Sequence, residues 1–151
     1  MKKVITALFI VFVLSLFYNT YRTPKLYDGK STYRIYTYSQ TYFKDSICDV
    51  LSGENVVTIK DTDLSTAMTK IGNYNSYETS FVGDEDAARE QIYRLNATII
   101  KTEKGDTGIT FYCFSNRFQN HILLDGERVN LHVIVRNDTV TIASPVIRGC
   151  A

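Results

Sequence analysis

The sequence predicts an α+β fold in which helices pack on one face of a twisted antiparallel sheet. Three observations favour this class. Segments rich in Tyr, Val and Ile recur along the chain, two intervening segments have the apolar spacing of a helix, and the last third alternates short strands with turns. With 151 residues, of which 44% are hydrophobic, the chain can bury the core of one domain.

An apolar segment precedes the predicted domain. Residues 4–17 carry no charge and follow Lys2 and Lys3, which is typical of a signal sequence. As a helix they would span roughly 21 Å, which is short against the ~30 Å hydrocarbon core of a bilayer. Large residues stand where a cleavage site has small ones, so we expect residues 1–21 to be an uncleaved transmembrane signal anchor. A cleaved signal peptide and a buried core helix are the alternatives.

The charges around this segment predict its orientation. Lys2 and Lys3 favour a cytoplasmic amino terminus, which would make the chain a single-pass protein of the cell membrane with its domain outside. Residues 22–31 contain proline and glycine without apolar periodicity, so we expect them to form a stalk. Residues 32–151 are then one extracytoplasmic domain, or a secreted one if the signal is cleaved.

The first half of the domain is predicted to alternate strands with helices. Residues 33–39 and 55–60 are rich in aromatic and β-branched side chains, which favours strands. Two helices are expected from apolar residues at helical spacing, the first ending at Gly53 and the second covering residues 62–71. The apolar residues of these helices are, in order, Phe43, Ile47, Val50 and Leu51, then Leu64, Ala67, Met68 and Ile71.

The second half of the domain is predicted to be mainly strands. They are expected at residues 76–82, 97–103 and 109–115, in a hairpin at 121–135, and at 139–147. A helix at 83–96 follows the first of these strands, and its acidic first turn suits the positive end of the helix dipole. Asp125-Gly126 is a strong hairpin signal, and Asn137-Asp138 is the expected turn into the last strand.

Two predicted strand ends share a pattern. Tyr-x-aromatic-Ser-amide-x-aromatic occurs at residues 36–42 and again at 112–118. It indicates either an ancient duplication or the common chemistry of tyrosine-rich strands. Because the elements expected after the two copies differ, the second explanation is favoured.

Candidate binding residues come from the aromatic strands and from the polar face of the hairpin. The 11 tyrosines and 8 phenylalanines are the most unusual feature of the composition. Some of them are expected to form an exposed patch for a protein or glycan, although tyrosines also fill half-buried sheets. We expect His132 at the surface. The candidate binding residues are Tyr36, Tyr38, Tyr112, Phe114, Ser115, Asn130 and His132.

The charge balance argues against nucleic acid as a partner. Without Lys2 and Lys3 the chain has 15 basic residues against 16 acidic ones, which is not the basic footprint that a phosphate backbone requires. No cofactor or metal site is expected either, because zinc, phosphate-loop and EF-hand spacings are absent. The acidic residues at 61–63 and 84–86 stand where helices begin, as capping residues do.

Three cysteines leave the redox state open. Cys113 and Cys150 are the pair that we expect if one disulfide forms, and three unpaired thiols are the alternative. A catalytic Cys113 would need an exposed thiol beside His132 and a nearby aspartate. We expect no catalytic residue, and a cysteine-dependent enzyme using Cys113 or Cys48 is the alternative. A pilin-like structural subunit is the second alternative, although the glutamate expected inside a pilin helix is absent.

The C-terminal half carries a set of features that resembles a known family. Residues 112–115 read Tyr-x-aromatic-Ser, a hydrophilic hairpin follows, and Val-Asn-Leu-x-Val at 129–133 leads to Ser-Pro-x-Ile at 144–147. In these features residues 80–149 resemble the YwmB-type extracytoplasmic proteins of Gram-positive bacteria, which are similar in fold to the TATA-box-binding protein. The resemblance implies a fold and brings no catalytic residue or ligand. We therefore expect a membrane-tethered or secreted, non-catalytic domain that binds a protein or a cell-envelope component.

Overall fold

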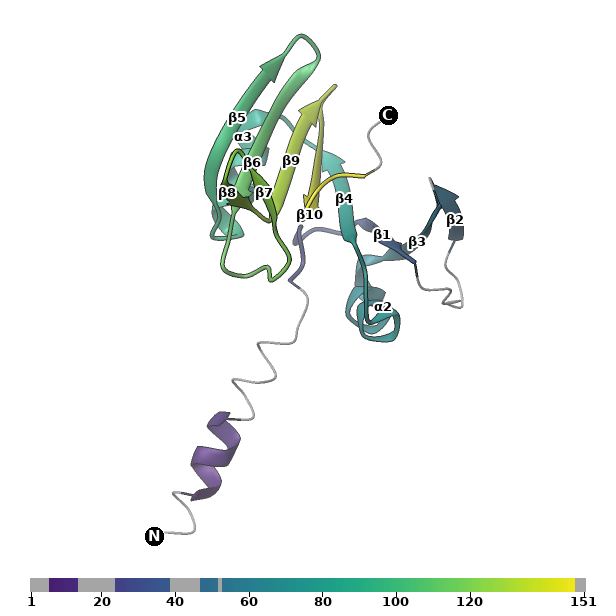
Figure 1. Cartoon of the computed structure of the whole chain (residues 1–151), viewed down its shortest axis with the longest axis vertical. Helices are drawn as coiled ribbons and strands as arrows, with labels where there is room; N and C mark the ends of the chain where they lie inside the picture. The colour runs from purple at the N-terminus through teal and green to yellow at the C-terminus, as the bar shows by residue number, and fades with distance from the viewer. Residues whose placement is uncertain (1–5, 14–23, 39–46, 52, 149–151) are drawn as a thin grey trace.

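The computed structural model describes residues 6–13, 24–38, 47–51 and 53–148. It confirms an α+β fold with a large antiparallel sheet and a few helices (Figure 1). Its elements are β1 (Thr32–Thr37), β2 (Ile47–Leu51), β3 (Glu54–Lys60), the 3-10 helix η1 (Asp61–Asp63), α2 (Leu64–Ile71), β4 (Ser76–Val82), α3 (Glu85–Arg94), β5 (Thr98–Gly105), β6 (Gly108–Phe114), β7 (Ile122–Leu124), β8 (Glu127–Val129), β9 (Leu131–Arg136) and β10 (Thr139–Ser144).

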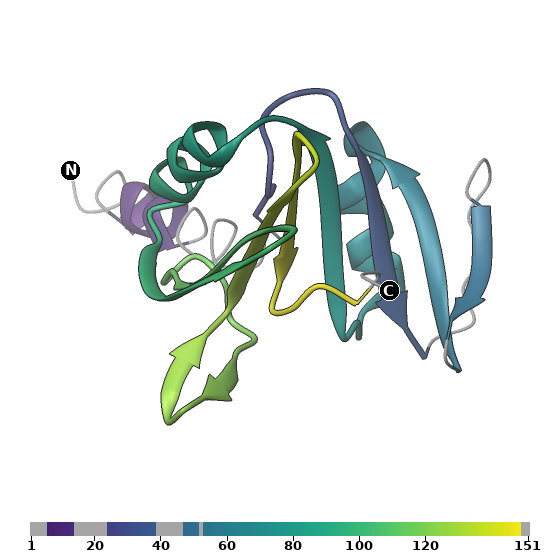
Figure 2. The same ribbon diagram turned by 90° about the horizontal axis from the view of Figure 1, so that it is seen from above.

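Eight strands form the main sheet in the order β2-β3-β1-β4-β10-β9-β6-β5. Every neighbouring pair is antiparallel. The strands of the first half of the chain therefore form one side of the sheet and those of the second half form the other. The two sides meet where β4 pairs with β10, near the middle of the sheet (Figure 2).

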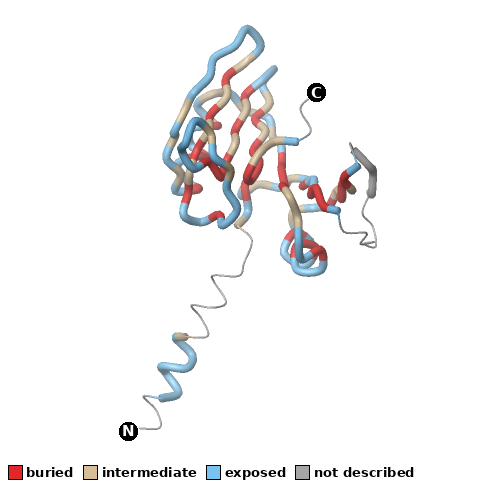
Figure 3. Tube along the Cα trace, in the orientation of Figure 1, coloured by how far each residue is buried: buried red, intermediate tan, exposed pale blue. Residues whose placement is uncertain are grey.

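One face of the sheet packs against α2 and α3 to form the core. The predicted apolar stripe of α2 is buried, and Ala88 and Ile92 of α3 join the same cluster. Alternation along the strands sends every second side chain into this cluster, as the alternating colours in Figure 3 show. The strand residues in the core are Tyr33, Ile35, Val57, Ile59, Tyr77, Ile109, Phe111, Cys113, Leu131, Val133, Val135, Val140 and Ile142.

The helix predicted before Gly53 is wrong over its described part. Residues 47–51 form strand β2, which pairs with β3 from Ile47 opposite Thr58 to Leu51 opposite Glu54. Gly53 makes the turn between these strands, with a φ of 85° that favours glycine. Apolar spacing over so short a segment fits a helix or a strand. Pairing with β3 selects the strand. Residues 39–46 lie outside the described part of the chain.

The predicted hairpin is real, but its second strand divides at Asn130. β8 pairs with β7 in a separate two-stranded sheet, whereas β9 joins the main sheet between β10 and β6. Both predicted turns are confirmed. Asp125 and Gly126, and likewise Asn137 and Asp138, have positive φ angles, as two-residue hairpin turns require.

The described part of the predicted stalk, residues 24–31, packs on the domain instead. Leu26 is fully buried in the core. The side-chain amide of Gln91 donates to the Leu26 carbonyl at 2.9 Å, and the Tyr77 hydroxyl donates to the carbonyl of Pro24 at 2.8 Å. The stalk prediction is therefore wrong for these residues, because an apolar side chain within the segment completes the core.

Residues 6–13 are helical, within the predicted anchor at 1–21. Residues 1–5 and 14–21 of that anchor lie outside the described part. Among the described residues, no helix has both the length and the apolar character needed to cross a membrane. The anchor thus stays a prediction.

Candidate functional site

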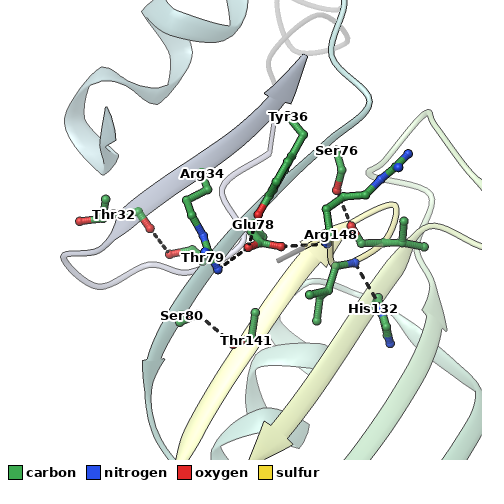
Figure 4. Close-up of polar contacts among 12 residues, drawn as sticks. Thr32, Arg34, Tyr36, Ser76, Glu78, Thr79, Ser80, His132, Thr141 and Arg148 are labelled. Carbon is green, nitrogen blue, oxygen red and sulfur yellow. Dashed lines mark hydrogen bonds and ion pairs between the residues drawn. The ribbon is translucent and has the colours of Figure 1, made fainter. Parts of the chain in front are cut away.

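A buried carboxylate lies on the sheet face opposite the helices (Figure 4). The side chain of Glu78 in β4 is 1% exposed. The Tyr36 hydroxyl donates to Glu78 Oε1 at 2.8 Å, and Arg34 forms an ion pair with the same oxygen at 2.5 Å. Because a buried charge is costly unless it is paired and hydrogen-bonded, these two neighbours stabilise the carboxylate inside the fold.

A segment that follows β10, residues 145–148, crosses this face, and we call it the strap. Three side chains of the sheet hold three consecutive strap residues (Figure 4). Ser76 Oγ donates to the Val146 carbonyl, the Ile147 N–H donates to Nδ1 of His132 at 3.2 Å, and the Arg148 N–H donates to Oε2 of Glu78 at 3.2 Å. All three bonds go to backbone atoms of the strap.

The side chain of Arg148 adds an electrostatic contact. Its Nη1 lies 3.7 Å from Oε1 of Glu54, whose side chain is 8% exposed. Asn75 fixes that carboxylate by donating from Nδ2 to the same oxygen at 2.6 Å. We define the strap site as the four sheet side chains that touch the strap, Glu54, Ser76, Glu78 and His132.

His132 is half-buried, so the expectation of a surface histidine is wrong. Its ring stacks on Tyr112 with centroids 4.7 Å apart, and the Ile147 N–H of the strap meets the ring edge at Nδ1. Since Nδ1 accepts a hydrogen bond, the proton of the neutral ring is on Nε2. Nε2 is buried and has no hydrogen-bond partner among the described residues. Burial lowers the pKa of His132 to about 4, which the Glu103 carboxylate opposes only in part.

The strand pairing brings these side chains into one cross-strand row. Residues directly opposite one another in adjacent strands share a face of the sheet. The row runs across six strands through Arg34, Glu78, Ala143, His132, Tyr112 and Lys101. Tyr36 stands next to it and reaches Glu78 with its hydroxyl. Of the predicted binding residues, Tyr36, Tyr112 and His132 are thus brought to the same face.

Ser115 and Asn130 are brought together as well, but in a buried clamp. The Ser115 N–H donates to Oδ1 of Asn130 at 2.8 Å, and Asn130 Nδ2 donates to the carbonyls of Ser115 at 2.7 Å and Phe118 at 3.0 Å. Both residues are at most 1% exposed. Their side chains therefore shape the loop after β6, and they do not present a binding surface.

The two remaining predicted binding residues differ in exposure. Tyr38, just after β1, is 71% exposed. Phe114 is half-buried and shares its side of β6 with Tyr112. The matching strand-end patterns also occupy unequal places, because β1 is third from one edge of the sheet and β6 is second from the other. Similar strand chemistry accounts for this better than duplication does.

The proposed cysteine chemistry does not assemble at Cys113. Cys113 lies opposite Leu131 in the β6–β9 ladder, whereas His132 lies opposite Tyr112, so the thiol and the imidazole point to opposite faces. Burial raises the pKa of the Cys113 thiol to about 12, and it is therefore protonated at neutral pH. Cys150 lies outside the described residues, so its pairing with Cys113 stays a prediction.

The acidic residues at helix starts have structural partners. Asp84 accepts a hydrogen bond from the Ala87 N–H at 3.0 Å and caps α3 as predicted. Among the described residues, no side chain caps η1 or α2, so the capping expected at residues 61–63 is wrong, and Asp61 instead lies 3.4 Å from Nζ of Lys25. In the part of the chain that the structure describes, no three His, Cys, Asp or Glu side chains gather into a possible metal site.

A separate open cleft of about 380 Å³ lies at one end of the sheet. The start of α3 and the β5–β6 and β9–β10 turns surround it. Its charged lining residues are Asp84, Glu85, Lys104, Arg136 and Asp138. The signs are mixed and Asp84 is already engaged as a cap, so this cleft offers a weaker chemical case than the strap site.

Sequence reasoning missed Glu54, Ser76, Glu78 and Arg148. The signal that existed was the alternation of residues 76–82, which places Ser76, Glu78 and Ser80 on the face opposite Tyr77. That alternation predicts a polar face but not a buried one. Burial arises when the strap returns from 70 residues further along the chain.

No family model, curated protein or solved structure matches this chain. The function is therefore inferred from the geometry of the strap site, the neighbouring sheet face and the apolar segment at the start of the chain.

Proposed function

We propose that this chain is a non-catalytic domain, tethered to the cell membrane and exposed outside it, that binds a protein or another component of the cell envelope. The observation that carries the tether is a run of five large apolar residues, 8–12, whose side chains are 51 to 67% exposed. A helix that is apolar on all sides is stable when it lies in an apolar environment. A bilayer supplies one.

The binding role is supported by the sheet face opposite the helices. Tyr112 and Phe114 are half-buried there, and Tyr38 adds an exposed aromatic ring after β1. Aromatic side chains with a polar tip are enriched in protein interfaces. The resemblance of residues 80–149 to YwmB-type proteins, which is itself a proposal, agrees with an extracytoplasmic location.

A binding role fits the chemistry better than catalysis does. Glu78 is engaged by Tyr36 and Arg34, and the Cys113 thiol is buried on the helix side of the sheet. A nucleophile or general base has to reach a substrate. These groups instead stabilise the fold around a face that can receive a partner.

The tether is tested by fractionation of cells that make the full chain. We expect the wild type to sediment with membranes and to resist carbonate extraction, and a protease added to intact cells to digest the domain. The double variant Leu8→Asp, Val11→Asp should be lost from the membrane fraction, because each carboxylate costs roughly 3 kcal/mol inside a bilayer. Wild-type chain found in the cytosol would contradict the tether, and chain released to the medium would support the secreted form.

The binding face is tested with a photo-cross-linking amino acid at Tyr38. Tyr93, which is 84% exposed on α3, is the matched control on the helix side. We expect discrete cross-linked species in intact cells from position 38 and none from position 93. The same products from both positions would indicate random collisions and count against a binding face.

A further inference from the structure

We propose that the strap site is a peptide-recognition site that the chain's own residues 145–148 occupy, and that its partner is a protein segment with two apolar residues followed by arginine. This inference rests on the proposed binding function and names its site and the chemistry of its partner. It is carried by the contacts between the strap and Glu54, Ser76, Glu78 and His132.

The strap site recognises backbone atoms of a segment that is neither helical nor paired in a sheet. One hydroxyl donates to a strap carbonyl, and an imidazole nitrogen and a carboxylate oxygen each accept from a strap N–H. None of these three hydrogen bonds depends on the side chains of the strap. Any segment with the same backbone path could form them, which is how peptide-binding proteins obtain affinity that tolerates different sequences.

Specificity would come from the residue at position 148. The guanidinium of Arg148 faces Glu54, a carboxylate that is nearly buried and that Asn75 holds in place. Arg34 already offsets the charge of Glu78, so Glu54 is the carboxylate that selects a cation at this position. Val146 and Ile147 are half-buried, which favours apolar residues before the arginine.

The strap is held loosely enough to be exchanged. It follows the end of β10 and belongs to neither sheet, so releasing it breaks no strand ladder. Its ion pair is long, and the Arg148 side chain is 44% exposed. A segment outside the sheet opens at a smaller free-energy cost than a paired strand does. Beneath the strap, Nε2 of His132 is buried without a hydrogen-bond partner among the described residues, and burying an unpaired polar atom is costly.

The test is a competition between the strap and a labelled peptide that copies residues 144–148, Ser-Pro-Val-Ile-Arg. The full-length double variant Ile147→Pro, Arg148→Pro has a strap without either N–H donor and without the arginine. By fluorescence polarisation in detergent micelles, we expect this variant to bind the peptide at least about tenfold more tightly than the wild type does. The reason is that an attached strap competes at an effective concentration of roughly millimolar.

Two altered peptides give the matched controls. A peptide with N-methyl groups on Ile and Arg lacks both donors, and a peptide ending in Glu reverses the charge. Each should bind the proline variant at least about tenfold more weakly. Adding Glu54→Gln to the proline variant should remove most of the preference for Arg over Glu. Equal binding of all three peptides, or no saturable binding to a folded proline variant, would overturn the proposal.

A second measurement uses the wild-type chain and so tests the proposal even if the proline variant does not fold. In the wild-type chain, excess peptide should speed the hydrogen exchange of the Ile147 and Arg148 amides and shift the imidazole signals of His132. If roughly millimolar peptide changed neither the hydrogen exchange nor the imidazole signals, the proposal would be contradicted. A dimeric wild type with a monomeric proline variant would assign the strap site to a second copy of this chain and overturn the partner peptide. The peptide test does not depend on membrane location, so its failure is distinguishable from loss of the tether.

Discussion

Glu78 and His132, two ionisable side chains on the sheet face opposite the helices, show how single residues shape the strap site. Glu78 has a cation and a phenol beside it, so its buried negative charge is offset by specific partners. Nε2 of His132 has no hydrogen-bond partner among the described residues, and a charged ring would be poorly solvated there. The stability that Glu78 contributes therefore depends on its partners, whereas the stability that His132 contributes depends on pH.

Acidification should destabilise the fold through His132. The unfolded chain gains a proton on this ring near pH 6.5, whereas burial keeps the folded pKa at about 4. The free energy of unfolding should therefore be highest above pH 6.5, fall as the pH drops from 6.5 to about 4, and level off below that. The contribution amounts to about 3 kcal/mol, measurable by urea unfolding over this pH range.

Two asparagine variants separate His132 from other titrating groups. His132→Asn offers an acceptor for the Ile147 N–H but does not titrate, so its stability should change less with pH than that of the wild type. His121→Asn changes the exposed histidine of the chain and should keep the wild-type slope. Equal slopes for all three proteins would show that His132 does not supply the pH dependence.

Removing the Glu78 carboxylate should be costly. Glu78→Ala leaves the buried Tyr36 hydroxyl and the Arg34 guanidinium without this acceptor, and we expect a loss of about 3 kcal/mol in the free energy of unfolding. Glu85→Ala is the control, because Glu85 forms an exposed pair with Arg89 one helical turn away and should cost less than about 1 kcal/mol. Similar losses in urea unfolding would contradict a stabilising role for the buried cluster.

At the scale of elements, strands β6 and β9 can approach closely because Gly108 has no side chain. A Cβ on Gly108 would overlap the carbonyl oxygen of Val135 in β9. Nothing lies within 4 Å of a Cβ placed on Gly105, at the end of the neighbouring strand β5. Close packing therefore requires a glycine at position 108 but does not require one at position 105.

This contrast predicts different outcomes for the same substitution. Gly108→Ala should lower the free energy of unfolding by at least about 2 kcal/mol, because backbone has to move to admit the methyl group. Gly105→Ala should change it by less than about 1 kcal/mol. Thermal unfolding of both variants checks the prediction, and a stable Gly108→Ala protein would mean that the β6–β9 register differs from the one described.

Elements also differ in how well the sequence predicted them. The stripe of α2 and the acidic cap of α3 are local patterns, and both are found where expected. Residues 47–51 had helical spacing but form a strand, because β3 provides a partner. The break at Asn130 was missed because it depends on hydrogen bonds with Ser115 and Phe118, which approach only in the folded chain.

At the scale of the whole molecule, the segment before β1 closes the core. Leu26 is fully buried among residues of both helices and several strands, and Tyr33 accepts at its hydroxyl from the Leu26 N–H at 3.1 Å. A segment expected to be a spacer between membrane and domain is therefore part of the fold.

Leucines in two environments test this closure. Leu26→Ala should destabilise the chain by about 2 to 5 kcal/mol, since it leaves a cavity in a packed core. Leu8→Ala makes the same change at a side chain that is 65% exposed, and we expect the free energy of unfolding in micelles to change by less than about 0.5 kcal/mol. Equal effects in denaturant titrations would contradict the packing of residues 24–31 on the domain.

The candidate site was predictable only in fragments. Tyr36, Tyr112 and His132 were chosen from strand chemistry, and they do share a face. Ser115 and Asn130 were chosen by the same reasoning and turned out to be a structural clamp. Glu78 could not be chosen, because nothing near it in the sequence indicates burial or a contact with Arg148.

The sequence by itself determined the α+β class, most strands, the apolar stripe of α2 and the two hairpin turns. These follow from local periodicity and turn chemistry, which act over a few residues. The tertiary structure decided that residues 47–51 pair as a strand, that Leu26 enters the core and that the strap lies over Glu78 and His132. Each of these depends on contacts between residues far apart in the chain, and their free energy exists only once the sheet has brought those residues together.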